Sequence, residues 1–161
     1  MQQRIPELDG VRGIAILAVF LNHTQPTLSG GFLGVDLFFA LSGFLITGIL
    51  LNEFNRTGSI SLRSFYYRRA LRLLPALVVF LLVCAPWAHW QATTATMFYF
   101  ANWHSFEFLG PLVHTWSLSV EEQFYIAWPV VLLLLLRLKL SKTAIAAGLI
   151  TIIALIFIWR L

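Results

Sequence analysis

Long apolar stretches separated by short polar segments dominate the sequence. Leu73–Trp90 and Thr143–Trp159 contain no charged residue, and Phe32–Leu51 contains only Asp36. A helix crosses the hydrocarbon core of a bilayer with roughly 20 apolar residues. These three stretches are therefore predicted to form membrane-spanning helices.

Two weaker stretches complete the pattern. Val11–Leu21 is apolar except for one arginine, and a turn at Ser29-Gly30-Gly31 would join it to the next stretch as a helical hairpin. Phe124–Leu136 is apolar but short, and it reaches spanning length only if its helix begins near Leu118. The predicted fold class is all-α: a polytopic integral membrane bundle of about five transmembrane helices.

The basic residues predict how this bundle is oriented. Segments 22–31 and 91–117 contain no lysine or arginine, whereas the N-terminal segment and the other two connections are basic. Positive charge marks cytoplasmic loops. The N-terminus is therefore predicted to be cytoplasmic, and the two connections without lysine or arginine are predicted to lie outside. Aromatic residues gather on that outer side, as in an interface belt: Trp87, Trp90, Tyr99, Trp103 and Trp116.

Composition narrows the class of protein. Hydrophobic residues make up 59% of the 161 residues and charged residues only 11%, whereas about a quarter of a soluble domain is charged. This argues against a soluble, disordered or nucleic-acid-binding protein, although the net charge is +4. The single Cys84 excludes an internal disulfide and a cysteine-based metal cluster. No H-x-x-x-H or comparable spacing occurs, so no metal is expected.

Ionisable residues within the predicted spans are candidates for function, because each costs at least a few kcal/mol there. His23 and Asp36 lie equally far from the centre of the first turn, so an antiparallel hairpin would place them at similar depth. Glu121 and Glu122 begin the fourth span on the same side, just after His114. One interpretation is an acid–base pocket in the outer half, in which Asp36 orients the His23 imidazole. The alternative is a set of polar groups that hold helices together, and for the three carboxylates both remain open.

Three arginines precede the third span. Arg68, Arg69 and Arg72 stand at i, i+1 and i+4, which places them at neighbouring positions of a helix. Guanidinium groups bind phosphate in a bidentate manner. The spacing therefore predicts a cytoplasmic phosphate-binding site. The alternative, ordinary positive-inside anchoring, accounts better for Arg56 and Arg63.

Two further residues belong to the candidate set. Arg12 precedes His23 by 11 residues, or about 16 Å along a helix, so one helix carries a cytoplasmic cation and a titratable base farther out. Ser42 is not surrounded by a G-x-S-x-G nucleophile motif. A packing or hydrogen-bonding role is therefore favoured for this serine.

Four ordered segments resemble the signatures of the membrane acyltransferase family 3. Leu8–Ala15 followed by His23 resembles its opening motif, Arg-x10-His. Gly31–Leu45 resembles the second motif, Phe65–Pro75 the third, which contains Arg-x-x-Arg, and His114–Tyr125 the fourth. Four such motifs in the same order make a chance resemblance improbable.

The resemblance implies an enzyme of the bacterial inner membrane that transfers an acetyl or other acyl group from acyl-CoA to a sugar hydroxyl. The acceptor would be a cell-surface glycan such as lipopolysaccharide O-antigen, with peptidoglycan and exopolysaccharide as further family targets. Acyl-CoA, the glycan and the lipid bilayer would be its partners; no nucleic acid or permanently bound cofactor is implied. The implied catalytic residues are His23, Arg12, Asp36 and Glu122, the donor-binding residues are Arg68, Arg69 and Arg72, and Ser42, His114 and Glu121 occupy further motif positions.

The chain departs from the family in length. Members usually have about twice as many spans, so residues 1–161 are expected to be the N-terminal part of an acyltransferase domain whose C-terminal half is missing. Two other functions stay open on the sequence alone. The chain would be half of a transporter, whose intramembrane charges line a path, or a non-catalytic membrane subunit.

Overall fold

The structure is a computed structural model that describes residues 6–24 and 33–159. All regular elements in this part of the chain are helices, which confirms the all-α class. The long helices are α1 (Pro6–Thr24), α2 (Leu33–Thr57), α3 (Leu62–Cys84), α6 (Thr115–Arg137) and α7 (Lys142–Trp159), and the short ones are α4 (Trp90–Met97), α5 (Phe106–Leu109) and the 3-10 turns η1 (Ala101–Trp103) and η2 (Gly110–Leu112).

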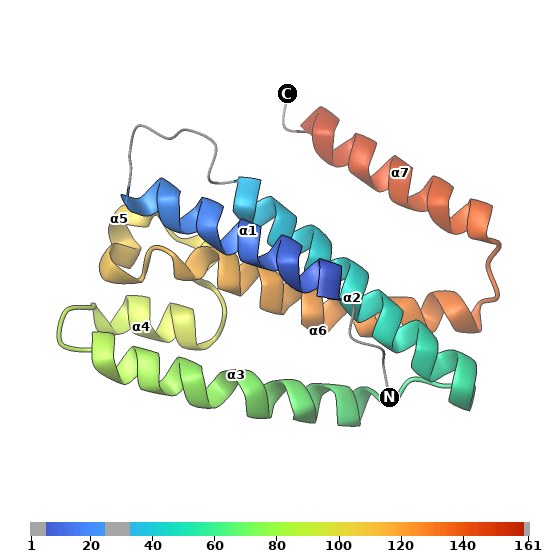
Figure 1. The fold of residues 1–161 in the computed structure, drawn as a ribbon, viewed down its shortest axis with the longest axis horizontal. Coiled ribbons are helices and arrows are strands. Elements are labelled where there is room, and N and C mark those ends of the chain that lie inside the picture. The colour runs from blue at the N-terminus through green and yellow to red at the C-terminus, as the bar shows by residue number, and fades with distance from the viewer. Residues whose placement is uncertain (1–5, 25–32, 160–161) are drawn as a thin grey trace.

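The first two helices form the predicted antiparallel hairpin, which packs on α6 (Figure 1). The turn predicted at Ser29-Gly30-Gly31 lies outside the described residues. Gly34 permits the close approach of α1 and α2, because a Cβ atom there would lie 2.6 Å from the Ala15 carbonyl oxygen and 2.8 Å from a Val19 methyl group. Small residues at such crossings allow helices to pack backbone to backbone.

The core consists of two apolar clusters along α3 and α6. One cluster surrounds Leu50 and Phe65, near the start of α3, and the other surrounds Leu77 and Leu112, nearer the end of α3. Between them in sequence on α3 lies Arg69. Along α3, Arg69 therefore has one cluster on either side, and the first cluster also contains Tyr125 of α6.

The third helix begins earlier than the sequence predicted. Its expected span starts at Leu73, but α3 already begins at Leu62 and contains Pro75 within it. Arginine is a good helix former, and buried Phe65 anchors the first turn in the core. The arginine motif therefore shares one continuous helix with the apolar stretch, while the end of that predicted span, Trp90, starts the separate helix α4.

Two described helices, α2 and α6, are long and apolar enough to cross a membrane. A shorter apolar helical segment covers residues 143–155 in α7. Helix α6 begins at Thr115, so it meets the condition that the sequence set for a full-length fourth span. Helices also form at the other three predicted spans, but spanning by all five remains a prediction.

Candidate active site

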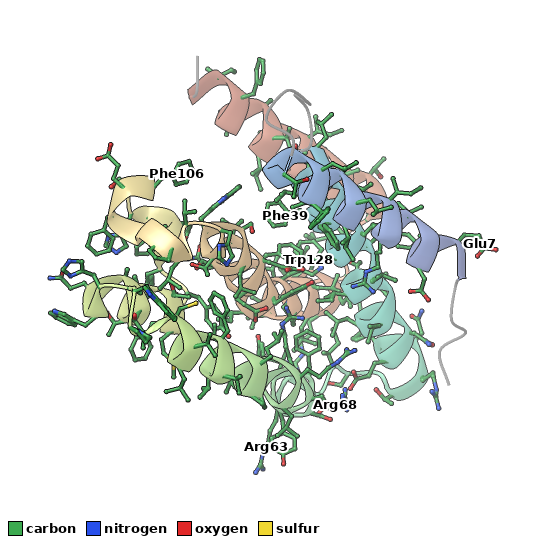
Figure 2. The ribbon with its side chains drawn as sticks, turned by 60° about the vertical axis from the view of Figure 1, so that its left-hand side comes forward. Glu7, Phe39, Arg63, Arg68, Phe106 and Trp128 are labelled. Atoms are coloured by element: carbon green, nitrogen blue, oxygen red, sulfur yellow. The ribbon has the colours of Figure 1, made fainter. Side chains whose placement is uncertain are left out.

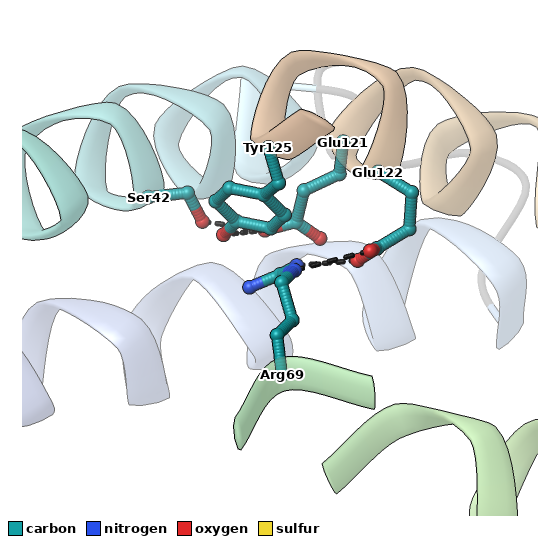
Figure 3. Close-up of polar contacts among 5 residues, drawn as sticks. All are labelled: Ser42, Arg69, Glu121, Glu122 and Tyr125. Carbon is teal, nitrogen blue, oxygen red and sulfur yellow. Dashed lines mark hydrogen bonds and ion pairs between the residues drawn. The ribbon is translucent and has the colours of Figure 1, made fainter. Parts of the chain in front are cut away.

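A partly buried ion pair joins the two helices that carry the third and fourth motifs. Arg69 on α3 donates its Nε–H to Glu122 Oε2 on α6 at 3.0 Å, and its Nη2 contacts the second carboxylate oxygen (Figure 3). The pair is bidentate, the geometry in which arginine binds carboxylate most strongly. Glu122 is only 5% exposed. The pair therefore holds two charges inside the helix bundle.

The neighbouring carboxylate collects two hydroxyl groups. Glu121 Oε1 accepts a hydrogen bond from the Ser42 hydroxyl on α2 and one from the Tyr125 hydroxyl one helical turn farther along α6, both at 2.5 Å. The Arg69 guanidinium carbon lies 3.0 Å from the centroid of the Tyr125 ring, as in a cation–π contact. Side chains from α2, α3 and α6 thus form one connected polar network (Figure 3).

Beside this network lies a cavity of about 510 Å³ with four arginines in its wall. Arg12 comes from α1, and Arg68, Arg69 and Arg72 come from α3. The Arg68 Nη1 donates to the hydroxyl of Ser64 at 2.5 Å, which fixes that side chain against its own helix. Arg69 is paired with Glu122 and the Glu121 carboxylate is also in the wall, so three arginines are left to bind an anion. Such a set suits a multiply charged anion, phosphate above all.

The sequence placed the arginines at the cytoplasmic side and both glutamates in the outer half. That separation is wrong for Arg69 and Glu122, which are in direct contact. Helices α3 and α6 run antiparallel (Figure 1), and the hydrogen bonds place Arg69 of one beside Glu122 of the other. Arg12 likewise lies with the arginines of α3, an association that the sequence did not specify.

The remaining candidate residues lie toward the other end of the hairpin. His23 is in the last turn of α1, and its side chain lies outside the described part of the structure. Asp36 is exposed in the first turn of α2. His114 precedes α6, and its ring contacts Phe80 edge-on at 5.5 Å between centroids. The proposed contact between His23 and Asp36 therefore remains a prediction.

Two site residues had no assigned role in the sequence. Tyr125 follows Glu121 by four positions, so helical spacing could have indicated their contact. Gln123, which follows Glu122 in the chain, donates to the Tyr99 carbonyl oxygen at 2.7 Å and to Asn102 Oδ1 at 2.9 Å. It thereby ties the connection between α4 and α6 to the helix that carries both glutamates. Burial, and then the charge of Glu122, raise the pKa of the Tyr99 phenol.

In the described part of the chain, no three His, Cys, Asp or Glu residues are grouped so that they could hold a metal ion. The groups that the site does contain can bind an anion through arginine, form hydrogen bonds through carboxylate and hydroxyl oxygens, and transfer protons.

Comparison with known proteins relates the chain to O-acetyltransferases. It is 38% identical over 154 residues to the peptidoglycan O-acetyltransferase OatA of Listeria monocytogenes, and 39% identical over 153 residues to the O-acetyltransferase OatA of Staphylococcus aureus strain NCTC 8325 / PS 47. A candidate O-acetyltransferase of S. aureus strain COL is 44% identical over 153 residues. These alignments cover 82–83% of the chain but 25% of each relative.

The chain thus spans about a quarter of the length of the curated relatives that it matches. No solved structure matches it. The profile of the acyltransferase domain matches residues 5–161, which is nearly the whole sequence. The chain therefore belongs to the acyltransferase family 3, a family of integral membrane acyltransferases.

Proposed function

We propose that the chain is part of a membrane enzyme that transfers an acetyl or other acyl group from acyl-CoA to a sugar hydroxyl of a cell-surface glycan. The arginine cavity is the observation that carries this proposal. Arg12, Arg68 and Arg72 line it together with Arg69, and CoA carries a pyrophosphate and a ribose phosphate. A cluster of guanidinium groups matches that distribution of charge.

The acceptor that we propose is peptidoglycan. Lipopolysaccharide O-antigen was the example that the family resemblance suggested. One relative, at 38% identity, is named a peptidoglycan O-acetyltransferase, and this name supports a cell-wall glycan in place of lipopolysaccharide. The donor would reach the arginine cavity from the cytoplasm, since the positive-inside rule puts the basic end of the five predicted spans there.

His23 is the base in the proposed reaction. A sugar hydroxyl is a weak nucleophile near neutral pH, and an imidazole with a pKa near 7 can take its proton during attack. The hydroxyl oxygen then bonds to the thioester carbonyl carbon and the carbon–sulfur bond breaks. The CoA thiolate leaves and takes up a proton. Asp36 would orient the imidazole, while the Arg69–Glu122 pair and the Glu121 network hold the helices around the donor.

The binding step is tested by removing single arginines from α3. Arg72→Ala, in the wall of the cavity, should weaken binding of CoA to the purified chain in nanodiscs by about 10- to 100-fold, because a charge-assisted hydrogen bond contributes roughly 1.5–3 kcal/mol. Arg63→Ala is the matched control, since Arg63 is exposed on the same helix. Calorimetry with CoA measures both. Equal affinities for the two variants, or no binding of CoA to the unmodified chain, would contradict the proposal.

The same measurement separates the rival functions. Half of a transporter or a non-catalytic membrane subunit has no reason to bind CoA through the arginine cavity. The chemical step is tested in the complete protein by His23→Ala, which should abolish acylation of peptidoglycan while membrane insertion persists. His89→Ala is the control, because His89 is an exposed residue before α4. Acylation retained by His23→Ala would exclude this histidine as the base.

A further inference from the structure

A second large cavity lies between α2, α6 and α7. Its volume is about 720 Å³, and aromatic and aliphatic side chains form most of its wall. Phe39 and Trp128, labelled in Figure 2, come from α2 and α6, and Ile153 comes from α7. Water gains few hydrogen bonds in such a space, so the cavity suits an apolar occupant.

The apolar cavity and the arginine cavity meet at one side chain. Glu121 lines both of them. Ser42 is in the wall of the apolar cavity and Tyr125 is in the wall of the arginine cavity, and both hydroxyls donate to the same oxygen of Glu121 at 2.5 Å. Glu121, hydrogen-bonded to one hydroxyl from each wall, is therefore the residue that the basic and the apolar cavity share.

These two spaces together match a ligand with an anionic head and a hydrocarbon tail. We infer that the apolar cavity binds the acyl chain of the CoA thioester and sets which chain lengths the protein accepts. The inference rests on the proposed function, because it requires the CoA phosphates at Arg12 and Arg72. The pantetheine arm would then run through the arginine cavity from the phosphates to Glu121, where the thioester would lie, and the acyl chain would continue into the apolar cavity. An acetyl group would leave most of the 720 Å³ unfilled, so acyl groups longer than acetyl should bind more tightly.

Gly43 is the position at which the depth of this cavity can be changed. It lies in the cavity wall, and a Cβ atom there would meet the Phe124 ring at 3.7 Å, an ordinary van der Waals distance. A larger side chain can therefore be introduced into the free space. Gly48 is a matched control on the same helix, because it is exposed and a Cβ atom there would meet nothing within 4 Å.

The test measures binding of CoA, acetyl-CoA, butyryl-CoA and hexanoyl-CoA to the purified chain in nanodiscs, with empty nanodiscs to subtract partition into lipid. Burial of a methylene group should strengthen binding roughly fourfold, the equivalent of about 0.8 kcal/mol. Each step of two methylenes should therefore raise the affinity of the unmodified chain about 15-fold. Gly43→Leu should remove most of the gain for hexanoyl-CoA while CoA itself binds as before. Gly48→Leu should keep the full gain.

Each outcome decides one question. No binding of CoA to the unmodified chain would refute the proposed function itself. Normal binding of CoA with no dependence on acyl length would leave the proposed function standing and overturn this inference, since bilayer lipid or another protein segment would then fill the cavity. The dependence of affinity on acyl length in the unmodified chain decides the question even where Gly43→Leu does not fold. The same gain in affinity with acyl length in Gly43→Leu and Gly48→Leu would also overturn the inference.

Discussion

Removal of the Glu122 carboxylate should destabilise the bundle strongly. In Glu122→Leu the Arg69 guanidinium keeps its place over the Tyr125 ring but loses both hydrogen bonds to the carboxylate. Loss of one member of a buried ion pair costs about 3–5 kcal/mol, because the other charge stays buried and unpaired. The Arg69 side chain is 22% exposed, against 6% for Glu122. Water can therefore reach the guanidinium, and we expect the lower value, about 3 kcal/mol.

Replacing Arg69 and Glu122 together should, in contrast, change the free energy of unfolding little. Arg69→Met with Glu122→Leu removes both charges and leaves apolar side chains of similar length, a change that is often neutral or stabilising in proteins. The double variant should therefore be within about 1 kcal/mol of the unmodified chain. Glu122→Leu should lose about 3 kcal/mol, and Arg69→Met, which leaves the more buried charge unpaired, about 3–5 kcal/mol. The coupling free energy of the cycle would then be several kcal/mol, well above the value for residues that do not interact.

The assay is reversible unfolding of the purified chain in mixed micelles, followed by circular dichroism, with the free energy of unfolding measured for all four members of the cycle. Glu107→Leu is the control for removing a carboxylate, because Glu107 is exposed in the short helix α5. It should change the free energy of unfolding by less than about 0.5 kcal/mol. Additive losses in the double variant, or a loss below about 1 kcal/mol for Glu122→Leu, would refute the buried ion pair.

Two further changes test the packing and the network. Gly34→Val should lower the free energy of unfolding by at least about 1–3 kcal/mol, because its Cβ would overlap the backbone of α1. Gly48→Val on the same helix should cost less than half as much. Equal losses in the same unfolding assay would contradict the close approach of α1 and α2. Tyr125→Phe should cost about 1–2 kcal/mol, because it removes one of the hydrogen bonds to Glu121 and keeps the ring under the guanidinium. Tyr67→Phe, at an exposed position of α3, should leave unfolding unchanged; a similar loss in both tyrosine variants would show that the Glu121 contact contributes nothing.

The pattern of apolar residues was sufficient to predict where most helices lie. The hairpin of α1 and α2 and the helix that becomes α6 followed from apolar length and from the glycines near residue 30. The start of α3 did not follow, because hydropathy marks the part of a helix that is apolar and not where the helix begins. Residues 62–72 are helical although they are basic, since Phe65 is buried in the core while Arg63 and Arg68 stay exposed.

Within the candidate site, local contacts were predictable and distant ones were not. The spacing of the arginines on α3 follows from helical geometry, and so would the contact of Glu121 with Tyr125. The contact of Arg69 with Glu122 joins residues 53 positions apart, and it depends on how far α3 slides along α6. Positive-inside counting assigns a charge to one end of a helix but carries no information on that register. Packing of Phe65 on α3 with Tyr125 and Leu132 on α6 contributes to it.

The ion pair also means that the four arginines should contribute unequally to the binding of an anion. Arg69 already neutralises Glu122, so its charge contributes little to a phosphate in the cavity. If CoA is the donor, as we propose, its phosphates must then be bound mainly by Arg12, Arg68 and Arg72. Arg68 and Arg72 are exposed. Loss of Arg69 should therefore act mainly through stability, and loss of Arg72 mainly through affinity. Binding and unfolding measured on the same two alanine variants distinguish these effects, since only Arg69→Ala should lower the free energy of unfolding by more than about 1 kcal/mol.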